Sequence, residues 1–363
     1  MINVTKTNLP PLAEYTKYLE GIWDRVHVTN RGPLVLELEE KLKEYLGVKN
    51  VLFVSNGTIA LQIAIKALEL KGEIITTPFS YVATTTAILW ENCQPVFVDI
   101  EPETFCIDPG KIEAAITDKT SAILATHVYG YPCQVEKIER LAEKYNLKVI
   151  YDGAHAFGVE INGTSVLNYG DVSTLSFHAT KLFHTIEGGA IITNNDELAN
   201  TIRLYHQFGH VGDDYYTMGI NGKNSELHAA MGHCNLPLVN DFIQARKNIS
   251  ELYDQMLLPL GVTRPAQPVD IDYNYSYYPV FFESEELLLK VRAKLLKNEI
   301  NTRRYFFPSL NQLPYHAGES CPVSEDIAGR VLCLPLYQEL PETEVKRIAG
   351  LIEEVIKVKT AAL

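Results

Sequence analysis

Seven short apolar runs, separated by amphipathic helical patterns, constrain the fold of this chain more than any other feature. They cover residues 51–55, 73–77, 95–100, 122–128, 147–152, 172–177 and 190–194. Between two of them, apolar side chains recur on one face of a helical pattern at residues 133–146. Runs that are apolar on both faces are typical of parallel strands covered by helices on each side. The sequence therefore predicts an α/β fold with a mainly parallel seven-stranded sheet.

The pattern changes past about residue 240, where strands and helices no longer alternate. The pattern predicts a strand at residues 274–284, a helix at residues 284–298, and a last helix at residues 341–358 with Pro341 near its start. We therefore expect two domains. Residues 1–240 form a large domain that includes the N-terminal segment, and residues 241–363 form a smaller α+β domain.

Composition excludes several classes of partner and site. The chain has 32 Lys and Arg against 45 Asp and Glu, a net charge of −13, which disfavours nucleic acid and anionic membrane surfaces. No stretch approaches the roughly 20 apolar residues of a membrane span, and the first residues lack a signal-peptide pattern. The six cysteines contain no CxxC pair, which indicates reduced thiols rather than disulfides or a metal site. We expect a cytoplasmic protein that binds no metal.

In a parallel sheet, ligands bind beyond the carboxyl ends of the strands, so the residues just after each run are the candidates. Ser55-Asn56-Gly57-Thr58 follows the first run and opens a helix. Free backbone N–H groups and the helix dipole favour an anion there, and Gly57 permits close approach. Taken alone, the segment also fits an ordinary turn and helix cap.

A carboxylate and an amine follow two later strands. Asp152 ends the run LKVIYD, and a buried acid at such a place needs a cationic partner, which the protonated pyridine nitrogen of pyridoxal phosphate (PLP) would supply. Lys181 follows VSTLSF, where desolvation would lower its pKa and make it an imine-forming nucleophile. Alternatively, Asp152 caps a helix and Lys181 lies in a surface loop.

Two further residues complete a possible cofactor site. Ser176 is placed to hydrogen-bond a phosphate, and Tyr81, just past a strand, is placed to stack on a pyridine ring or to pack in the core. The order along the chain is a phosphate loop, a stacking aromatic, a strand-end acid and a strand-end lysine. A PLP enzyme of fold type I needs these parts together at one edge of the sheet.

Six segments together carry a resemblance to a known family. They read SNGTIAL, PFSYVAT, PVFVDIEPETFCIDP, DGAHAFG, SFHATKLFHTIEGG and GINGKNSELHAAMG. In combination they resemble the DegT-type nucleotide-sugar aminotransferases, and the similarity runs from residue 30 to residue 337. The segments KLFHTIEGG and GINGKNSE look most like the branch that makes dTDP-4-amino-4,6-dideoxyglucose.

The resemblance implies a role for each matching residue. Lys181 matches the Schiff-base and catalytic lysine, Asp152 the partner of the pyridine nitrogen, and His155 a residue near the cofactor's phenolic oxygen. The remaining cofactor contacts match Gly57, Thr58, Ser176 and Tyr81, and, from a neighbouring subunit, Asn221 and Lys223. A homodimer with shared active sites is therefore implied, with pyridoxamine phosphate as the intermediate form of the cofactor.

The resemblance also implies the reaction. The expected activity transfers an amine from L-glutamate to a nucleotide-linked keto sugar, dTDP-4-keto-6-deoxy-D-glucose, for O-antigen or other glycan biosynthesis. Candidate substrate contacts are Arg303, Arg304 and Tyr305 for the diphosphate or base and His184 for the sugar. Each also fits a structural role, in a solvated turn or in packing. His127 is either a cofactor contact or the cap of a strand.

Four alternatives remain to be weighed. The amino group could go to C3 or C4 of another UDP-, GDP- or dTDP-linked keto sugar. A sugar dehydratase of the same family would carry histidine at the position of Lys181. A non-catalytic PLP-binding regulator would normally carry an added DNA-binding domain, and a Rossmann oxidoreductase would show GxGxxG after a strand. Two departures from the family pattern, Ile186 and Gly153, predict altered packing rather than lost activity.

Overall fold

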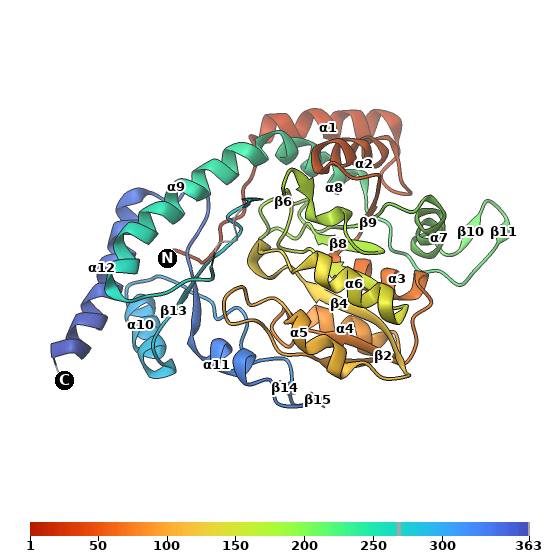
Figure 1. Cartoon of the computed structure of the whole chain (residues 1–363). Helices are drawn as coiled ribbons and strands as arrows, with labels where there is room; N and C mark the ends of the chain where they lie inside the picture. Colours follow the sequence, from red (N-terminus) through yellow and green to blue (C-terminus); the bar gives the residue numbers. More distant parts are fainter. Residues whose placement is uncertain (267–269, 362–363) are drawn as a thin grey trace.

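The computed structural model describes residues 1–266 and 270–361, and Figure 1 shows its elements. Seven strands form one sheet in the order β1-β9-β8-β5-β4-β2-β3. Their bounds are β1 Asn50–Val54, β2 Glu73–Thr76, β3 Gln94–Phe97, β4 Thr120–Thr126, β5 Lys148–Asp152, β8 Val172–Ser176 and β9 Gly189–Thr193. Every pair is parallel except the two made by β9, which runs antiparallel to β1 and β8. The predicted fold class and the mainly parallel seven-stranded sheet are confirmed.

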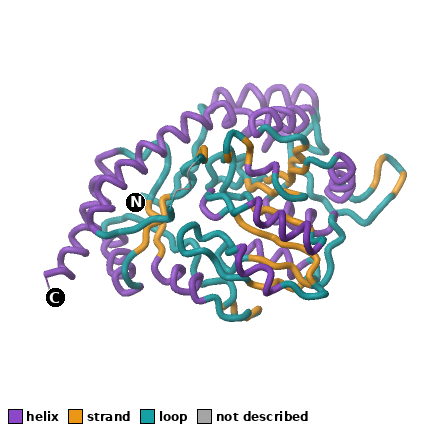
Figure 2. Tube along the Cα trace, viewed as in Figure 1, coloured by secondary structure: helices purple, strands orange, loops and turns teal. Residues whose placement is uncertain are grey.

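Helices cover both faces of this sheet because its strands present apolar side chains to each side. In β4, Ala122 and Leu124 pack in one core, and Ile123 and Ala125 pack in another. The first face is covered by α3 (Gly57–Ala67), α4 (Val82–Trp90) and α7 (Asp196–His206). The opposite face is covered by α2 (Pro33–Leu46), α5 (Pro109–Ile112), α6 (Val135–Tyr145) and α8 (Glu226–Asn235). In Figure 2 the helices flank the strands on both sides.

The C-terminal part has a core of its own. Its antiparallel pair is β13 (Tyr278–Phe281) with β16 (Val331–Leu334), and α9 (Val239–Leu257), α10 (Glu285–Lys297) and α12 (Glu342–Ala361) pack around it. The predicted strand and two helices are present, but β16 was not among the predicted strands. β13 and β16 are short strands that lie far apart in the sequence. Local periodicity does not show that two such strands pair.

The boundary predicted at residue 240 falls within α9, which runs from α8 to the C-terminal part in Figure 1. Phe242 near its start packs in the core over the sheet, whereas Ile249 and Tyr253 pack in the C-terminal core. The chain also returns to this part at its beginning, since Ile2 pairs with Ile300. The two-domain division stays a prediction.

The remaining elements are short or peripheral. Helix α1 spans Leu12–Arg25 and α11 spans Pro322–Arg330, and the small strands are β6 Glu160–Ile161, β7 Thr164–Ser165, β10 His210–Val211, β11 Asp214–Tyr215, β12 Ile271–Asp272, β14 Gln312–Leu313 and β15 His316–Ala317. The β10–β11 hairpin stands away from the body of the molecule (Figures 1 and 2). All six cysteines are free thiols. Among the described residues, no helix is both long and apolar enough to cross a membrane.

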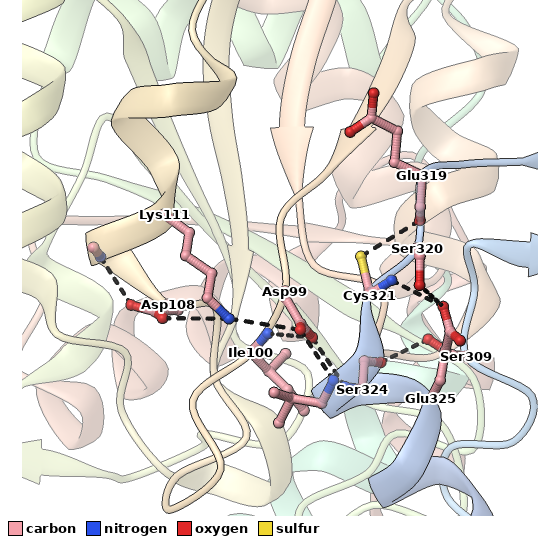
Figure 3. A network of polar contacts seen from close by, with 12 residues as sticks. Asp99, Ile100, Asp108, Lys111, Ser309, Glu319, Ser320, Cys321, Ser324 and Glu325 are labelled. Atoms are coloured by element: carbon pink, nitrogen blue, oxygen red, sulfur yellow. Dashed lines mark hydrogen bonds and ion pairs between the residues drawn. The ribbon is translucent and has the colours of Figure 1, made fainter.

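A buried aspartate joins the loop after β3 to α11 (Figure 3). The Asp99 carboxylate accepts hydrogen bonds from the backbone N–H groups of Val323 at 3.0 Å and Ser324 at 2.9 Å. Lys111 Nζ lies 3.6 Å from the same carboxylate. Asp99 thus satisfies free N–H groups in the first turn of α11 and fixes this helix against the sheet domain.

Candidate active site

A cavity of about 360 Å³ lies beyond the carboxyl ends of β1, β5 and β8. It gathers residues from separate parts of the chain. The predicted site residues that line it are Gly57, Thr58, Tyr81, Asp152, His155, Ser176, Lys181, Arg303 and Tyr305. Parallel strands bring the ends of β5 and β8 to one edge of the sheet, so Asp152 and Lys181 meet there.

Asp152 is buried at the end of β5 and is held by two hydrogen bonds. The Thr84 hydroxyl donates to its Oδ2 at 2.8 Å, and the backbone N–H of Ala154 donates to its Oδ1 at 3.1 Å. Burial raises the pKa of Asp152, while these two hydrogen bonds and the charge of Lys181 lower it. Burial still disfavours the charge of this carboxylate, so a further cationic partner would stabilise it.

Behind Asp152, buried hydroxyl groups continue the network. The Ser80 and Thr84 hydroxyl oxygens are 2.8 Å apart, and the Thr126 hydroxyl donates to Ser80 Oγ at 3.1 Å. All three side chains are buried. The chain of hydroxyl groups orients the Thr84 donor toward the carboxylate, and such buried polar networks are rigid when every member has a partner.

Lys181 lies in the loop that follows β8, with its side chain extending into the cavity. Burial lowers the pKa of Lys181, and the nearby Asp152 partly opposes that shift. Its Nζ donates a hydrogen bond to Tyr277 Oη at 3.3 Å. A lowered pKa increases the fraction of free amine near neutral pH, and the free amine is the form that attacks a carbonyl carbon.

His155 presents an N–H group rather than a charge to the cavity. Its Nδ1 accepts a hydrogen bond from the backbone N–H of Tyr129 at 3.1 Å, so the neutral ring carries its proton on Nε2. Burial holds the pKa of His155 well below its ordinary value. The ring is parallel to Phe306, at 5.6 Å between centroids and 5° between planes, so its orientation is fixed.

The first turn of α3 lies beside Ser176, and together they have the features of an anion site, here called the anion cradle. Asn56 caps the helix by accepting a hydrogen bond from the Ile59 N–H, which leaves the N–H groups of Gly57 and Thr58 without helical partners. A Cβ atom added to Gly57 would lie 3.0 Å from Ser176 Cβ. Glycine is therefore required for the helix end and the serine to approach this closely.

Tyr81, Arg303 and Tyr305 form the rim of the cavity. Tyr81 is 57% exposed and stands at the end of the loop between β2 and α4. The guanidinium of Arg303 lies 5.4 Å from the centroid of the Tyr305 ring. A cation and two aromatic rings at one opening suit a ligand with both anionic and planar groups.

Five predicted candidates for the site do not line this cavity. His184 is buried, with Nε2 2.6 Å from the carbonyl oxygen of Asn8. Arg304 turns away from the cavity, and its guanidinium bonds to Glu285 at 2.6 Å. Asn221 is exposed and pairs through its backbone with Gln207, and Lys223 Nζ lies 4.5 Å from the Phe208 ring. His127 is also outside the cavity; it is buried and stacks on Tyr151.

Other cavity residues were not singled out in the sequence. They include Ser80, Tyr277 and Phe306. Tyr277 falls in the tyrosine-rich run YNYSYY, and that enrichment just before an apolar strand is the one signal that marks it. Thr84 stands in a run of three threonines, and nothing in the pattern distinguishes it from its neighbours.

Ile186 occupies a backbone conformation that glycine prefers. Its φ is 71°, and β-branched residues rarely adopt positive φ. The side chain lies outside the cavity and is 40% exposed. The departure from the family pattern at this position therefore strains the loop after Lys181 locally, without placing a new group near Asp152.

Comparison with known proteins agrees with this geometry. The profile of the DegT/DnrJ/EryC1/StrS aminotransferase family matches residues 12–353. The chain belongs to this family. Membership confirms both the predicted resemblance and the prediction that the protein is an aminotransferase.

Individual family members are similar over nearly the whole chain. The dTDP-4-amino-4,6-dideoxy-D-glucose transaminase of Shigella dysenteriae is 45% identical over 98% of this chain and 99% of its own length. The structure of DesI in the presence of its TDP-sugar product has a TM-score of 0.94 at 32% identity, covering 98% of this chain and 93% of DesI. The structure of NtdA from Bacillus subtilis with bound cofactor PMP has a TM-score of 0.88 at 30% identity, covering 95% of this chain and 82% of NtdA.

Proposed function

We propose that the chain is a PLP-dependent aminotransferase that converts dTDP-4-keto-6-deoxy-D-glucose to dTDP-4-amino-4,6-dideoxy-D-glucose with L-glutamate as amino donor. The observation that carries the proposal is that Lys181 and the buried Asp152 line one cavity beside an anion cradle, with their charges acting on each other. The similarity to the Shigella dysenteriae transaminase supports the reaction and the sugar. The TDP-sugar product of DesI supports the nucleotide.

The residues in the cavity fit PLP. Gly57 leaves the space that a Cβ would fill beside Ser176, and the free N–H groups of the α3 N-terminus suit a phosphate. Asp152 lies where a protonated ring nitrogen would give it a cationic partner. The Nε2–H of His155 is a donor suited to the phenolic oxygen. The bound cofactor supplies an aldehyde that combines with amines and a ring that withdraws electrons.

Lys181 does the chemical work of the chain itself. Its amine would hold the cofactor, and as a free amine it would accept and donate the proton that moves during the reaction. Desolvation prepares the amine for both tasks, because it keeps a useful fraction uncharged. Burial raises the pKa of Asp152, and the hydrogen bonds from Thr84 and Ala154 oppose that shift and favour its carboxylate form. In that form Asp152 would pair with the ring nitrogen of the bound cofactor.

The sugar nucleotide would enter past the rim of the cavity. Arg303 is exposed there and suits the diphosphate, and the rings of Tyr81 and Tyr305 suit the sugar or the base. His184 and Arg304 are less suited to direct contact, because their polar atoms already bond within the chain. A contribution from them would require these bonds to break.

A homodimer accounts for the position of Asn221 and Lys223 outside the cavity of their own chain. The segment before them exposes a series of apolar side chains, namely Phe208, Val211, Tyr215, Tyr216, Met218 and Ile220. A protein surface with so many exposed large apolar groups in one segment is typical of an interface. We infer that a second copy covers this segment and that Asn221 and Lys223 reach the phosphate in the partner's cavity. A cytoplasmic location and a role in O-antigen or other glycan synthesis stay predictions.

The test is a panel of keto-sugar nucleotides incubated with the protein, PLP and L-glutamate, with product carbon, configuration and nucleotide read by mass spectrometry and NMR. We expect the dTDP-4-keto-6-deoxy sugar to be aminated in preference to the UDP and GDP sugars. Replacing Lys181 with Ala should abolish turnover by orders of magnitude while sugar-nucleotide binding persists. Binding of PLP without turnover of any sugar would favour the regulator over the enzyme.

A further inference from the structure

Tyr277 is a half-buried residue in the wall of the cavity, and its hydroxyl contacts the amine of Lys181. Lys181 Nζ donates to Tyr277 Oη at 3.3 Å, and the two residues are 96 positions apart in the chain. Within the described part of the chain, Lys181 is the hydrogen-bond partner of this hydroxyl. The contact therefore joins the C-terminal part of the chain directly to the central lysine.

The segment that carries Tyr277 is fixed to the loop after β5. Asn274 Nδ2 donates to the carbonyl oxygens of His155 at 2.8 Å and Phe157 at 2.9 Å, and Ser276 Oγ donates to that of His155 at 3.1 Å. On the other side, Arg246 Nη1 donates to the Ser276 carbonyl at 3.2 Å. Four hydrogen bonds thus hold the backbone just before Tyr277 in one place relative to Asp152 and His155.

Aromatic packing fixes the ring as well. The Tyr277 ring lies edge-on to His155, with centroids 4.8 Å apart, and edge-on to Tyr305 at 5.7 Å. Edge-to-face pairs restrict the orientation of a buried ring. The hydrogen bonds of the preceding segment and the packing of the ring therefore fix the hydroxyl next to Lys181. The contact does not depend on the position of the flexible lysine alone.

We propose that Tyr277 holds the amine of Lys181 by accepting its hydrogen bond during the steps in which this amine is not bonded to the cofactor. This role rests on the proposed aminotransferase function. A lysine side chain has four rotatable bonds, so an amine without a partner would sample positions away from the reacting carbon atoms. A fixed acceptor keeps the amine within reach of them.

Electrostatics agrees with an accepting hydroxyl. Burial raises the pKa of Tyr277, with opposite effects from Arg246 and Asp152, so the hydroxyl is neutral and its lone pairs are available. The charged or titratable groups that act on Lys181 are Asp152, Tyr305 and Tyr81, and the pKa of the amine is lowered mainly by burial. Removing the Tyr277 hydroxyl would leave the Lys181 ammonium with one hydrogen-bond acceptor fewer, which would favour the uncharged amine further.

The first experiment measures this effect on the full chain without cofactor. Labelling of Lys181 by an amine-reactive reagent is followed by peptide mass spectrometry across pH, for the wild type and for Tyr277→Phe. We expect the labelling midpoint of Tyr277→Phe to fall by about one pH unit, the size of a hydrogen bond to a charged group. The matched control is Tyr273→Phe, which removes a partly buried hydroxyl that donates to the Tyr129 carbonyl at 2.9 Å, and its midpoint should stay at the wild-type value.

The second experiment measures the half-reaction of the holoenzyme with L-glutamate by the loss of the visible absorbance of the lysine-bound cofactor. Tyr277→Phe should lower the rate at saturation by about tenfold and change the KM for glutamate by less than about twofold, because the amine and not the substrate loses a contact. A midpoint and a rate equal to those of Tyr273→Phe would overturn the proposal. A shifted midpoint in a protein whose wild type shows no transamination would instead refute the proposed function and leave the contact between Lys181 and Tyr277 established.

Discussion

The hydroxyl of Thr84, from the first turn of α4, lies 2.8 Å from Oδ2 of Asp152 at the end of β5. This contact gives the buried carboxylate a neutral hydrogen-bond donor, and under the proposed function Asp152 would also accept a hydrogen bond from the cofactor. It also makes α4, which carries no charged residue, part of the active site. The charge state of Asp152 therefore depends on a residue that does not itself line the cavity.

Replacing Thr84 with Val should weaken cofactor binding. The change keeps the branched shape but removes the donor to a buried carboxylate, an interaction of about 1.5–3 kcal/mol, so the PLP dissociation constant should rise by at least about tenfold. Thr86→Val is the matched control on the same helix, because the Thr86 hydroxyl donates to the Val82 carbonyl. Equal affinities for PLP in the two variants, measured by absorbance titration, would show that the Thr84 contact is unimportant.

Asp152 predicts a pH dependence for the stability of the cofactor-free protein. Because burial raises its pKa in the folded state, the unfolded chain loses this proton first, and the stability contributed by Asp152 decreases as pH rises from about 4 through the raised value. Asp152→Asn should therefore gain stability relative to wild type over that window, by a few degrees in Tm at neutral pH. Thermal unfolding from pH 4 to pH 8 measures this difference.

An exposed aspartate with the opposite shift provides the control for this measurement. Hydrogen bonds from Asn50 and Lys49 lower the pKa of Asp196, so its contribution is present at neutral pH and is lost as pH falls. Asp196→Asn should therefore lose thermal stability relative to wild type as pH rises, whereas Asp152→Asn should gain it. Parallel curves for the two variants would contradict the assignment of a raised pKa to Asp152.

Gly57→Ala should damage the phosphate cradle. The added methyl would lie 3.0 Å from Ser176 Cβ and 3.3 Å from its Cα, so the helix end and the serine must separate. We expect PLP affinity to fall by tenfold or more, equivalent to about 1.4 kcal/mol, because the N–H groups then miss the phosphate. Gly350→Ala, in α12 with nothing within 4 Å of the added atom, should leave PLP affinity unchanged. Equal affinity in both variants would place the phosphate elsewhere.

Mixing two inactive variants tests the shared active site. If Lys223 serves the partner's cavity, a hybrid dimer of Lys181→Ala and Lys223→Ala chains contains one site with both lysines intact. Random exchange of subunits should then restore about a quarter of the wild-type sites. Activity is measured before and after the mixture is unfolded and refolded together. If mixing restores no activity while a dimer is present by light scattering, Lys223 belongs to its own chain's site or to none.

The active-site edge of the sheet could be predicted because its parts lie at the ends of apolar runs. Asp152 ends one strand and Lys181 follows another within a few residues, and parallel strands bring such residues together whatever the exact register. Glycine at the start of α3 was equally visible. These features depend on local periodicity and on the direction of the strands, and both are encoded in short stretches of sequence.

The orientation of individual side chains could not be predicted in the same way. Arg303 and Arg304 are neighbours, yet only the first faces the cavity, because side chains alternate along the extended segment that pairs with β16 at Cys333. His184 is predicted near the sugar, but in the structure it is buried and its ring contacts the carbonyl oxygen of Asn8, near the start of the chain. Local sequence does not show such a partner.

The sequence by itself determined the sheet, its active-site edge and the family, since these follow from strand-length patterns and from motifs read in order along the chain. Only the tertiary structure decided which residues complete the site. Thr84 reaches Asp152 from 68 positions away, and Tyr277 reaches Lys181 from the C-terminal part. Contacts of this kind form when helices pack on the sheet and the chain returns to it, and packing is a property of the whole fold rather than of any segment.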